Sequence, residues 1–561
     1  MIDNLKLIQD PHSMNIYAGG PQGLFMFNPQ KHSALTVERN CESKISLLKE
    51  GRNGNPLFIC GINRQNTECC DVSSAHQLVN CYSLKTPPKI SEPSVHVGDS
   101  LYYTVSHRDK AQSHLSGLYR SAVDKYIWPL SRQLEQRYFK IIANQGSGLL
   151  DGKVYSFYIE QTQNQDPEMP LWIPRVSQIC MADLGGSKAI LQFRWTSMLT
   201  ARLFCGDEKK RTTYSEFLDV AVLEAPDWEN TTIYGLFKNA YNLSALCVYR
   251  MSDIIRVFES NSFKSSQEPL SSPRPGECVK NSLSLPSNIL RFMESLPELK
   301  QWIKPVRNPL LFNPHHHYTH LQVDRLENRK SGHSHQVLFM SLDNGNVHKI
   351  LEQDDEPFII TEYQPFKTRT HISSMLLDSV NKKLFVSSSS EVIQIDLYNC
   401  GVYGTHCDSC VMARDPYCGW DLLACSANNG SAVELHAVEV SECEFFVPIT
   451  SESSSHGKRE TLISVPQYSS FYLKCPMESQ HASYAWYHQG RWRACVSSEQ
   501  DCLALIDNMS DENEGVYQCI ASENGYDRAV VLQQLQMNGA SRTKATRVAL
   551  AWLLCLIFVI C

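Results

Sequence analysis

The sequence predicts an all-β chain of three modules, and three observations lead to this fold class. Short β-rich segments separated by Gly, Asn, Asp and Pro turns repeat from residue 16 to about residue 397. A block of six cysteines follows between residues 400 and 443. The third segment, 459–537, has the cysteine, tryptophan and tyrosine spacing of a two-sheet β-sandwich.

The first module, residues 1–398, reads as a β-propeller. Segments such as "IYAGGPQGLFMFN" and "VLFMSLDNGNVHKI" alternate strand and turn, and no strand–helix–strand alternation interrupts them. Radial four-stranded blades suit such a repeat because they leave few open sheet edges. The length fits about seven blades of roughly 50 residues. The best candidate for an amphipathic helix is 287–303.

The second module, residues 399–444, contains "CDSCVMARDPYCGWDLLAC", which raises a choice between metal, redox and disulfide chemistry. A zinc site needs a second ligand pair to match Cys407 and Cys410, but Cys418 and Cys425 stand singly. The thioredoxin-like context that a redox pair prefers is absent from the sequence pattern. A module this small lacks a sufficient core, so we expect disulfides that each stabilise it by about 2–4 kcal/mol.

The third module carries the core pattern of an immunoglobulin sandwich. Cys475 is followed by Trp486 and by "DENEGVYQC", which ends at Cys519. In such a sandwich the disulfide joins the two sheets, the indole packs against it, and Tyr517 forms the corner hydrogen bond. The polar stretch 444–458 reads as a linker.

Composition excludes several classes of function. The chain has 561 residues, is 42% hydrophobic and carries a formal net charge of −7, so it can bury large cores but lacks the basic stripe that nucleic acid requires. Hydrolase, nucleotide-binding and metalloprotease motifs are absent from the sequence. We expect no nucleic-acid partner, no cofactor and no enzymatic activity.

Cysteine usage indicates the secretory pathway. The 21 cysteines gather at 41–81, 180–278, 400–443 and 475–519, as expected for separate modules folded in an oxidising compartment. Four glycosylation sequons agree with this location; they begin at Asn230, Asn242, Asn429 and Asn508.

The two ends of the chain carry different signals. The start, "MIDNLKLIQD", has no signal-peptide pattern. The end, "VALAWLLCLIFVIC", is an apolar tail shorter than the roughly 20 residues that a membrane-spanning helix needs. Small residues from Asn538 to Ser541 and a short polar spacer precede it, which is the pattern of a glycosylphosphatidylinositol (GPI) addition signal over 538–561. We expect Asn538 as the attachment site, with a short tail-anchoring helix as the alternative, and a precursor that begins upstream of residue 1.

Several stretches resemble semaphorins. "CVMARDPYCGWD" resembles the plexin–semaphorin–integrin (PSI) module that follows a semaphorin domain, and "VSQICMADLGG", "RWTSMLTARLFC", "SALCVYRMSDIIRVF" and "PRPGEC" match the family in order. The order semaphorin, PSI, immunoglobulin and GPI signal is similar to that of the class 7 semaphorins. Plexin-type and hepatocyte-growth-factor-receptor-type receptors share the first two modules, but would carry a cytoplasmic signalling region.

The resemblance implies a set of disulfides. The expected pairs are Cys60–Cys69, Cys180–Cys278, Cys205–Cys247, Cys400–Cys418, Cys407–Cys443, Cys410–Cys425, Cys475–Cys519 and Cys495–Cys502. Three cysteines remain open. Cys70–Cys81 is a possible pair, and Cys41 is then unpaired or bonded to another molecule.

Class 7 semaphorins can carry Arg-Gly-Asp, an integrin motif, directly after the cysteine that matches Cys180. Here the positions are Met181, Ala182 and Asp183. Asp183 retains the carboxylate that would bind the integrin metal, but Met181 cannot replace the cation, so we expect weak or absent integrin binding. The triplet Leu218-Asp219-Val220 resembles another integrin motif, but we expect it to pack within a strand.

The segment "NPHHHYTH" brings together His315, His316, His317 and His320. Adjacent residues on a strand point to opposite faces, and no carboxylate or cysteine is near in sequence. We interpret this segment as a loop or strand entry rather than as a metal site.

The resemblance implies a GPI-anchored ligand on the outer membrane leaflet that binds a class C plexin as a homodimer, with an integrin as a doubtful second receptor. The family's processes are axon growth, cell migration and immune regulation. The alternative is a non-signalling decoy or adhesion protein with an incomplete propeller, because only fourteen residues precede "NIYAGG". Receptor-contact residues lie on loops without a sequence signature.

Overall fold

The first unit of the chain consists of sheets whose strands alternate with tight turns. The computed structural model describes residues 5–10, 13–21, 23–28, 33–36, 44–63, 66–75, 77–106, 115–122, 125–130, 134–148, 150–162, 171–260, 262–264, 272–327, 334–352, 357–403, 407–421, 423–427, 461–477, 479, 481–497, 501–523 and 526–538. The chain divides into two units, which we treat separately. Unit 1 contains 1–402, 414–419 and 426–432, and unit 2 contains the rest.

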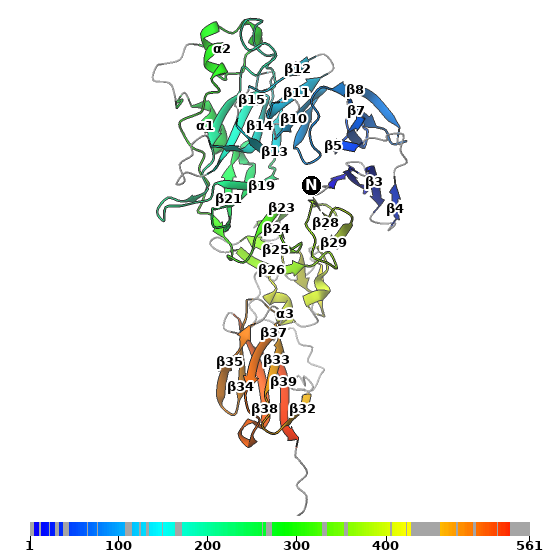
Figure 1. Ribbon diagram of the computed structural model, residues 1–561, viewed down its shortest axis with the longest axis vertical. Helices are drawn as coiled ribbons and strands as arrows, with labels where there is room; N and C mark the ends of the chain where they lie inside the picture. Colours follow the sequence, from blue (N-terminus) through cyan, green and yellow to red (C-terminus); the bar gives the residue numbers. More distant parts are fainter. Residues whose placement is uncertain are drawn as a thin grey trace, which may run out of the picture. The chain divides into compact units, whose positions relative to one another are not determined.

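Unit 1 forms a propeller, and the prediction of an all-β fold with seven blades is confirmed. The sheets radiate around a centre near the N-terminal end of the chain (Figure 1). Blades 1–3 contain β1 (Lys6–Gln9), β2 (Ile16–Gly20), β3 (Gly23–Asn28) and β4 (Ser33–Thr36); β5 (Lys44–Glu50), β6 (Leu57–Asn63), β7 (Asn66–Val72) and β8 (Leu78–Leu84); and β9 (Ser94–Val97), β10 (Ser100–Val105), β11 (Gly117–Ala122) and β12 (Lys125–Ile127).

The remaining blades follow in chain order. Blades 4–7 contain β13 (Gln136–Asn144), β14 (Lys153–Gln161), β15 (Trp172–Cys180) and β16 (Leu199–Arg202); β19 (Glu216–Leu223), β20 (Thr232–Lys238), β21 (Ser244–Arg250) and β22 (Leu310–Leu311); β23 (Tyr318–Glu327), β24 (Ser334–Leu342), β25 (Val347–Glu352) and β26 (Pro357–Tyr363); and β27 (Ser374–Asp378), β28 (Lys383–Ser387) and β29 (Val392–Asp396). A small hairpin, β17 (Gly206–Asp207) and β18 (Thr212–Thr213), lies between blades 4 and 5.

The middle strands are apolar because each blade is covered on both faces. In β14, "KVYSFYIEQ", the seven central residues are all buried. Phe217 of β19 stacks on Phe237 of β20 with ring centroids 4.4 Å apart, and both side chains belong to the large core shared by blades 4 and 5. Aromatic pairs of this kind contribute beyond their buried area. Between blades 4 and 5, the ring of Phe139 in β13 lies 5.3 Å from that of Phe217, centroid to centroid, so side chains pack the two blades together.

The ring closes where blade 7 meets blade 1. β1 pairs with β2 in blade 1, and in the described part of the chain no fourth strand pairs with β29. Leu7 and Ile16 instead pack against Phe385 of β28, and the Gln9 amide donates to the Asp378 carboxylate at 2.9 Å. Among the described residues, closure therefore rests on side-chain packing and side-chain hydrogen bonds between blades 7 and 1.

Two helices lie between β21 and β22. α1 (Met251–Glu259) was not predicted, although its buried Ile254, Val257 and Phe258 have helical spacing. α2 (Ser287–Glu294) is shorter than the predicted 287–303, so that prediction is wrong in extent. Leu296 has a positive φ of 53° and Pro297 follows it, which ends the helix. The 3₁₀ turns η1 (Trp228–Asn230) and η2 (Ser282–Ser284) complete this region.

The cysteine-rich module is divided between the two units. It contains η3 (Cys400–Tyr403), α3 (Cys407–Met412), and the paired strands β30 (Cys418–Trp420) and β31 (Cys425–Ala427). Its residues 428–444 lie outside the described part, as does the predicted linker.

Unit 2 contains a two-sheet sandwich. One sheet has the order β32 (Thr461–Pro466), β39 (Tyr526–Asn538), β38 (Gly515–Glu523), β34 (Ser483–His488) and β35 (Arg491–Ala494); the other has β33 (Phe471–Pro476), β37 (Asp501–Ile506) and β36 (Val496–Ser497). A 3₁₀ turn, η5 (Asp511–Asn513), precedes β38. Trp486 is buried in the core with both bridging cysteines, and the Tyr517 hydroxyl donates to the Asn513 carbonyl at 3.2 Å. Among the described residues, no helix is long and apolar enough to span a membrane.

Candidate functional site

Disulfides hold each module, and their geometry decides the chemistry of the cysteines. The structure joins Cys60–Cys69, Cys70–Cys81, Cys180–Cys278, Cys205–Cys247, Cys400–Cys418, Cys410–Cys425, Cys475–Cys519 and Cys495–Cys502. Cys407 is also disulfide-bonded, whereas Cys41 and Cys443 lie outside the described residues. Glu68, Cys70 and Cys81 lie within 4.8 Å of one another, but the disulfide leaves no thiolate for a metal.

The loop after Cys180 contains the degenerate integrin motif. The Cys180–Cys278 bridge fixes its start, and the Arg120 guanidinium donates to the Met181 carbonyl at 3.0 Å. The Met181 amide donates to the Gly152 carbonyl at 2.9 Å. The backbone of the motif is therefore held from two sides.

The Asp183 carboxylate is an internal acceptor. It is 2% exposed and accepts from the backbone N–H groups of Gly185, Thr196 and Ser197 at 2.8–2.9 Å and from the hydroxyls of Thr196 and Ser197 at 2.9 and 2.7 Å. Five donors occupy its oxygens, so the expectation that Asp183 is available to an integrin metal is wrong. The sequence could not show this because Thr196 and Ser197 are distant along the chain.

The second integrin-like triplet lies in β19. Asp219 accepts from the backbone N–H of Leu321 in blade 6 at 2.8 Å and from that of Val220 at 2.8 Å. Burial raises the pKa of Asp219 to about 6. The carboxylate links two blades, which agrees with the interpretation that this triplet packs within a strand.

Beside the loop, two aromatic side chains are presented to solvent. Phe193 is 58% exposed and Trp128 is 40% exposed, and the Trp128 amide donates to the Phe193 carbonyl at 2.8 Å. Phe193 and Leu191 both have positive φ angles, 57° and 59°, which is uncommon for bulky residues. Strained backbone together with exposed aromatics marks this surface, which we call the Trp128–Phe193 surface, as a candidate binding site.

The predicted modification sites that the structure describes are exposed. Asn230, Asn242 and Asn508 are exposed, and Asn429 lies outside the described residues. The Asn242 amide nitrogen is 2.9 Å from Nδ1 of His317. Asn538 is exposed at the end of β39, and 539–561 lie outside the described part.

The histidine segment enters β23. His315 is exposed, His316 packs edge-on against His348 with ring centroids 4.8 Å apart, and Nδ1 of His320 lies 2.9 Å from the Ser341 hydroxyl. Burial lowers the pKa of His320 to about 4. These positions agree with a strand entry, and in the described chain no three-ligand cluster includes any of them.

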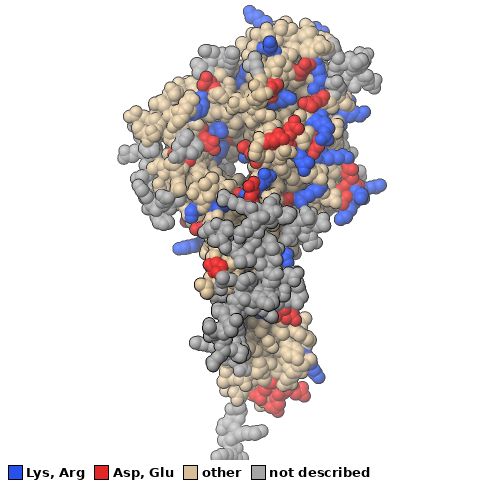
Figure 2. Space-filling view, turned by 180° about the vertical axis from the view of Figure 1, so that it is seen from behind, with Lys and Arg blue, Asp and Glu red and all other residues tan. Residues whose placement is uncertain are grey.

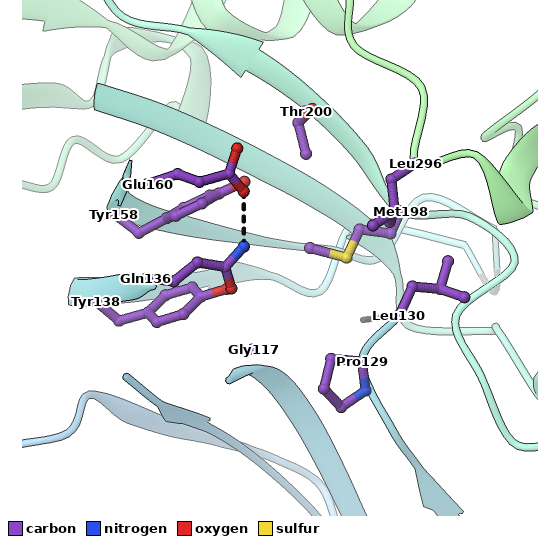
Figure 3. A pocket seen from close by; sticks show the side chains of 10 residues that line it. All are labelled: Gly117, Pro129, Leu130, Gln136, Tyr138, Tyr158, Glu160, Met198, Thr200 and Leu296. Carbon is purple, nitrogen blue, oxygen red and sulfur yellow. Dashed lines mark hydrogen bonds between the residues drawn. The ribbon is translucent and has the colours of Figure 1, made fainter. Parts of the chain in front are cut away.

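Two hollows in the described part of unit 1 are a small cavity and an open groove. A cavity of about 10 Å³, which holds about one water, lies between Gln136, Tyr138, Tyr158 and Glu160 on one side and Met198 on the other (Figure 3). The Gln136 amide donates to Glu160 at 2.9 Å. An open groove of about 240 Å³ lies at Cys278; its other lining residues include Lys153, Gln178, Phe258, Glu259 and Arg274.

Family models match all three modules. The Sema domain model matches residues 217–379, the plexin repeat (PSI) model matches 399–443, and an immunoglobulin domain model matches 448–533. Semaphorin-7A from Mus musculus is 30% identical over 554 residues, covering 93% of this chain and 82% of the relative. This chain belongs to the semaphorin family. Semaphorin-7A from Homo sapiens is also 30% identical, over 94% of this chain and 83% of the relative.

Solved semaphorin structures share the fold. Drosophila Semaphorin 2a aligns with a TM-score of 0.72 at 18% identity and covers 96% of each chain. A structure of Drosophila Plexin A in complex with Semaphorin 1b aligns with a TM-score of 0.63 at 18% identity, covering 80% of this chain and 98% of the other. Semaphorin, PSI and immunoglobulin domains together are those of a cell-surface or secreted protein.

In this semaphorin the PSI motif docks onto the propeller through a buried charge network. The Lys349 ammonium in blade 6 is fully buried and lies 2.6 Å from the Asp415 carboxylate. The Tyr417 hydroxyl donates to Asp324 at 2.5 Å, and the Lys382 ammonium lies 2.8 Å from the same carboxylate. Asp415 and Tyr417 belong to "RDPYCGW", so this motif carries a docking role that sequence reasoning missed.

Proposed function

We propose that this semaphorin is an extracellular ligand that binds a plexin-type receptor, of class C by resemblance, through its propeller. The carrying observation is the similarity to Semaphorin-7A across the whole order of Sema, PSI and immunoglobulin domains. Support also comes from the solved complex of Drosophila Plexin A with Semaphorin 1b, because its fold matches that of this chain. Regulation of axon growth, cell migration and immune responses is the corresponding biological role.

We assign the receptor contact to the Trp128–Phe193 surface. Binding hot spots favour aromatic residues that lose water on contact, and these two side chains expose their rings while their backbones remain bonded to each other. A strained loop held by the buried Asp183 presents this surface in one conformation. Preorganisation of this kind reduces the ordering cost of binding.

The ligand acts as a GPI-anchored homodimer in this proposal. A two-fold dimer that holds two receptors raises the effective concentration of their cytoplasmic regions. This approach of the two cytoplasmic regions transmits the signal. Exposed Asn538 at the end of β39 is the attachment site for the lipid. Treatment of displaying cells with phosphatidylinositol-specific phospholipase C should release the chain, and retention on the cells would refute the anchor.

Integrin is not a receptor through the degenerate motif. Because five donors hold the Asp183 carboxylate, the double change Met181→Arg/Ala182→Gly should not create integrin binding in a solid-phase assay. Saturable binding of integrin to that variant, with metal dependence, would show that the loop opens.

Receptor binding tests the proposal directly. The chain, secreted with an added signal peptide, should bind an immobilised class C plexin ectodomain. Phe193→Ala should weaken binding by about 2 kcal/mol, a roughly thirty-fold loss in affinity. Tyr241→Ala, at an aromatic that is 84% exposed in blade 5, is the matched control and should leave affinity unchanged. Equal effects of the two variants would reject the Trp128–Phe193 surface.

A second candidate is the non-signalling decoy or adhesion protein. In the part of the chain that the structure describes, blade 7 has three strands and none pairs with the outer edge of β29, which favours this candidate because an unpaired edge invites pairing with another chain. The decoy would bind plexin without triggering a response in plexin-bearing cells. The proposed ligand would produce that response.

A further inference from the structure

A tribasic turn, Lys209, Lys210 and Arg211, lies at the tip of the β17–β18 hairpin. All three residues are exposed, as are Glu208 before them and Thr212 after them. The Lys210 side chain is 74% exposed. Arg211 has a positive φ of 54°, at the point where the chain reverses direction. The turn therefore presents three consecutive cations to solvent.

Weak contacts hold this hairpin closed. β17 and β18 pair at two positions. The Asp207 carboxylate accepts from the backbone N–H groups of Lys209 and Lys210 at 2.9 and 3.2 Å. The Glu208 carboxylate lies 2.7 Å from the Lys304 ammonium, and both side chains are 61% exposed. Exposed ion pairs are weak, and a loop tip with few buried contacts opens at low cost in free energy. A protease can therefore receive this turn as an extended chain.

The chain on both sides of the hairpin is fixed to unit 1. The Tyr214 amide donates to the Cys205 carbonyl at 2.8 Å, and Cys205 is bonded to Cys247. A second bridge, Cys180–Cys278, also encloses the turn. A cut within the turn therefore leaves the two sides joined by these two bridges.

A second run of consecutive basic residues in the described part of the chain, Lys382 and Lys383, provides a comparison. Lys382 also lies in a turn and has a positive φ of 52°. Its ammonium, however, lies 2.8 Å from the Asp324 carboxylate, and its side chain is 14% exposed. The Lys383 ammonium lies 3.3 Å from the Asp396 carboxylate. This run is committed to internal partners, so the tribasic turn is the more accessible of the two.

The distribution of charge favours a protease over a long polyanion as the partner of the turn. On the face of the molecule that Figure 2 shows, Lys and Arg side chains are interspersed with Asp and Glu. Asp207 and Glu208 directly precede the three cations. A polyanion requires a broad basic stripe, whereas a protease that selects basic residues requires adjacent cations for its acidic subsites.

We propose that the Arg211–Thr212 bond is a processing site for a serine endoprotease of the secretory pathway that selects Lys-Arg pairs. Lys210 and Arg211 occupy the two acidic subsites before the cut bond. Hydrolysis breaks the bond between the Arg211 carbonyl carbon and the Thr212 nitrogen. The hydroxyl of water goes to the carbon and its hydrogen to the nitrogen, and the new acid passes its proton to the new amine.

The product is a nicked chain whose fragments end at Arg211 and begin at Thr212, and which the Cys205–Cys247 and Cys180–Cys278 bridges hold together. Receptor binding is not required for this step. The only requirement is passage through the secretory pathway, which the disulfides and the extracellular domains indicate.

Digestion of the whole secreted chain tests this site. The folded chain is incubated with purified kexin, a protease that cuts after Lys-Arg pairs, and a synthetic peptide of residues 206–215 is digested in parallel. The fragment that ends at Arg211 should separate only after reduction, and N-terminal sequencing should find a new terminus at Thr212. If the peptide is cut while the folded chain stays intact at this bond, the turn does not open and the proposal is overturned.

Two variants show whether the basic pair directs the cut. Lys210→Gln/Arg211→Gln removes the pair and should slow cleavage at this bond at least a hundred-fold. Lys209→Gln removes a neighbouring exposed cation but keeps the pair, so its cleavage rate should stay within about three-fold of wild type. Equal rates in wild type and the double variant would contradict recognition of Lys210 and Arg211.

Secreting cells provide the final test. Chain collected from their medium should carry the Thr212 terminus, and an inhibitor of proteases that select basic pairs should remove it. A chain that purified kexin cuts but that secreting cells leave whole would show an accessible turn without processing, and would overturn the proposal.

Discussion

Replacement of Asp183 by Asn tests whether this residue organises the loop beside the Trp128–Phe193 surface. The side chain keeps its shape, but one carboxylate oxygen becomes an NH₂ group. Oδ2 of Asp183 accepts from the Thr196 amide, the Ser197 amide and the Ser197 hydroxyl at 2.8, 2.9 and 2.7 Å. An NH₂ group at that position faces three donors and accepts from none.

The magnitude follows from those three donors. A buried donor left unsatisfied costs about 1–3 kcal/mol, and the hydroxyl of Ser197 can turn toward another acceptor. The two backbone amides cannot turn. We therefore expect Asp183→Asn to reduce the free energy of unfolding of the propeller by about 3–5 kcal/mol, since hydrogen bonds to a charged group are also lost.

Denaturant unfolding and receptor binding provide the assay. Asp183→Asn should lower the denaturation midpoint, expose segment 180–199 to hydrogen exchange and weaken plexin binding in parallel. Asp253→Asn is the control; this residue forms a surface pair with Arg256 at 3.0 Å, worth about 0.5 kcal/mol at most. If Asp183→Asn unfolds within about 1 kcal/mol of wild type, the carboxylate does not organise the loop.

Three further predictions concern other parts of the molecule. Lys349→Met should destabilise the chain by about 3–5 kcal/mol because it removes the cation that pairs with the buried Asp415 carboxylate. In denaturant unfolding, the double variant Lys349→Met/Asp415→Leu should recover most of that loss. If the losses of the two single changes add up in the double variant, the two residues do not act as a pair. Burial holds the pKa of His96 at about 3 in the folded chain. Below pH 6.5 the unfolded chain therefore binds more protons than the folded chain, and the free energy of unfolding decreases as the pH is lowered. His96→Phe should spare about 2 kcal/mol of that loss at pH 4.5, and unchanged pH curves would refute this. Tyr517→Phe should cost the immunoglobulin domain about 0.5–1.5 kcal/mol in calorimetry, and an unchanged transition would show that the corner bond is dispensable.

Most of the fold could be predicted from local sequence motifs. The immunoglobulin pattern of Cys475, Trp486, Tyr517 and Cys519 could be predicted because each residue has one fixed task in a two-sheet sandwich. The propeller followed from repeated strand and turn. α1 was missed because its nine residues are short beside the long strand pattern around them, although Ile254 is spaced correctly for a helix.

The chemistry of the candidate site depended on contacts distant in sequence. From the sequence, Asp183 is predicted to be an available metal ligand, but in the fold its carboxylate accepts hydrogen bonds from Thr196 and Ser197. Lys349 gives no sign of its partner 66 residues away. The positive φ of Phe193, which presents its ring to solvent, is invisible in the sequence because no glycine marks the turn.

The mass of the complex with a class C plexin ectodomain tests the central claim most directly. Sedimentation of the secreted chain mixed with receptor should give one complex that contains two copies of each, because a dimeric ligand brings two receptors together. A complex of one copy each, or no complex at micromolar concentration, would contradict a signalling ligand that acts through its propeller.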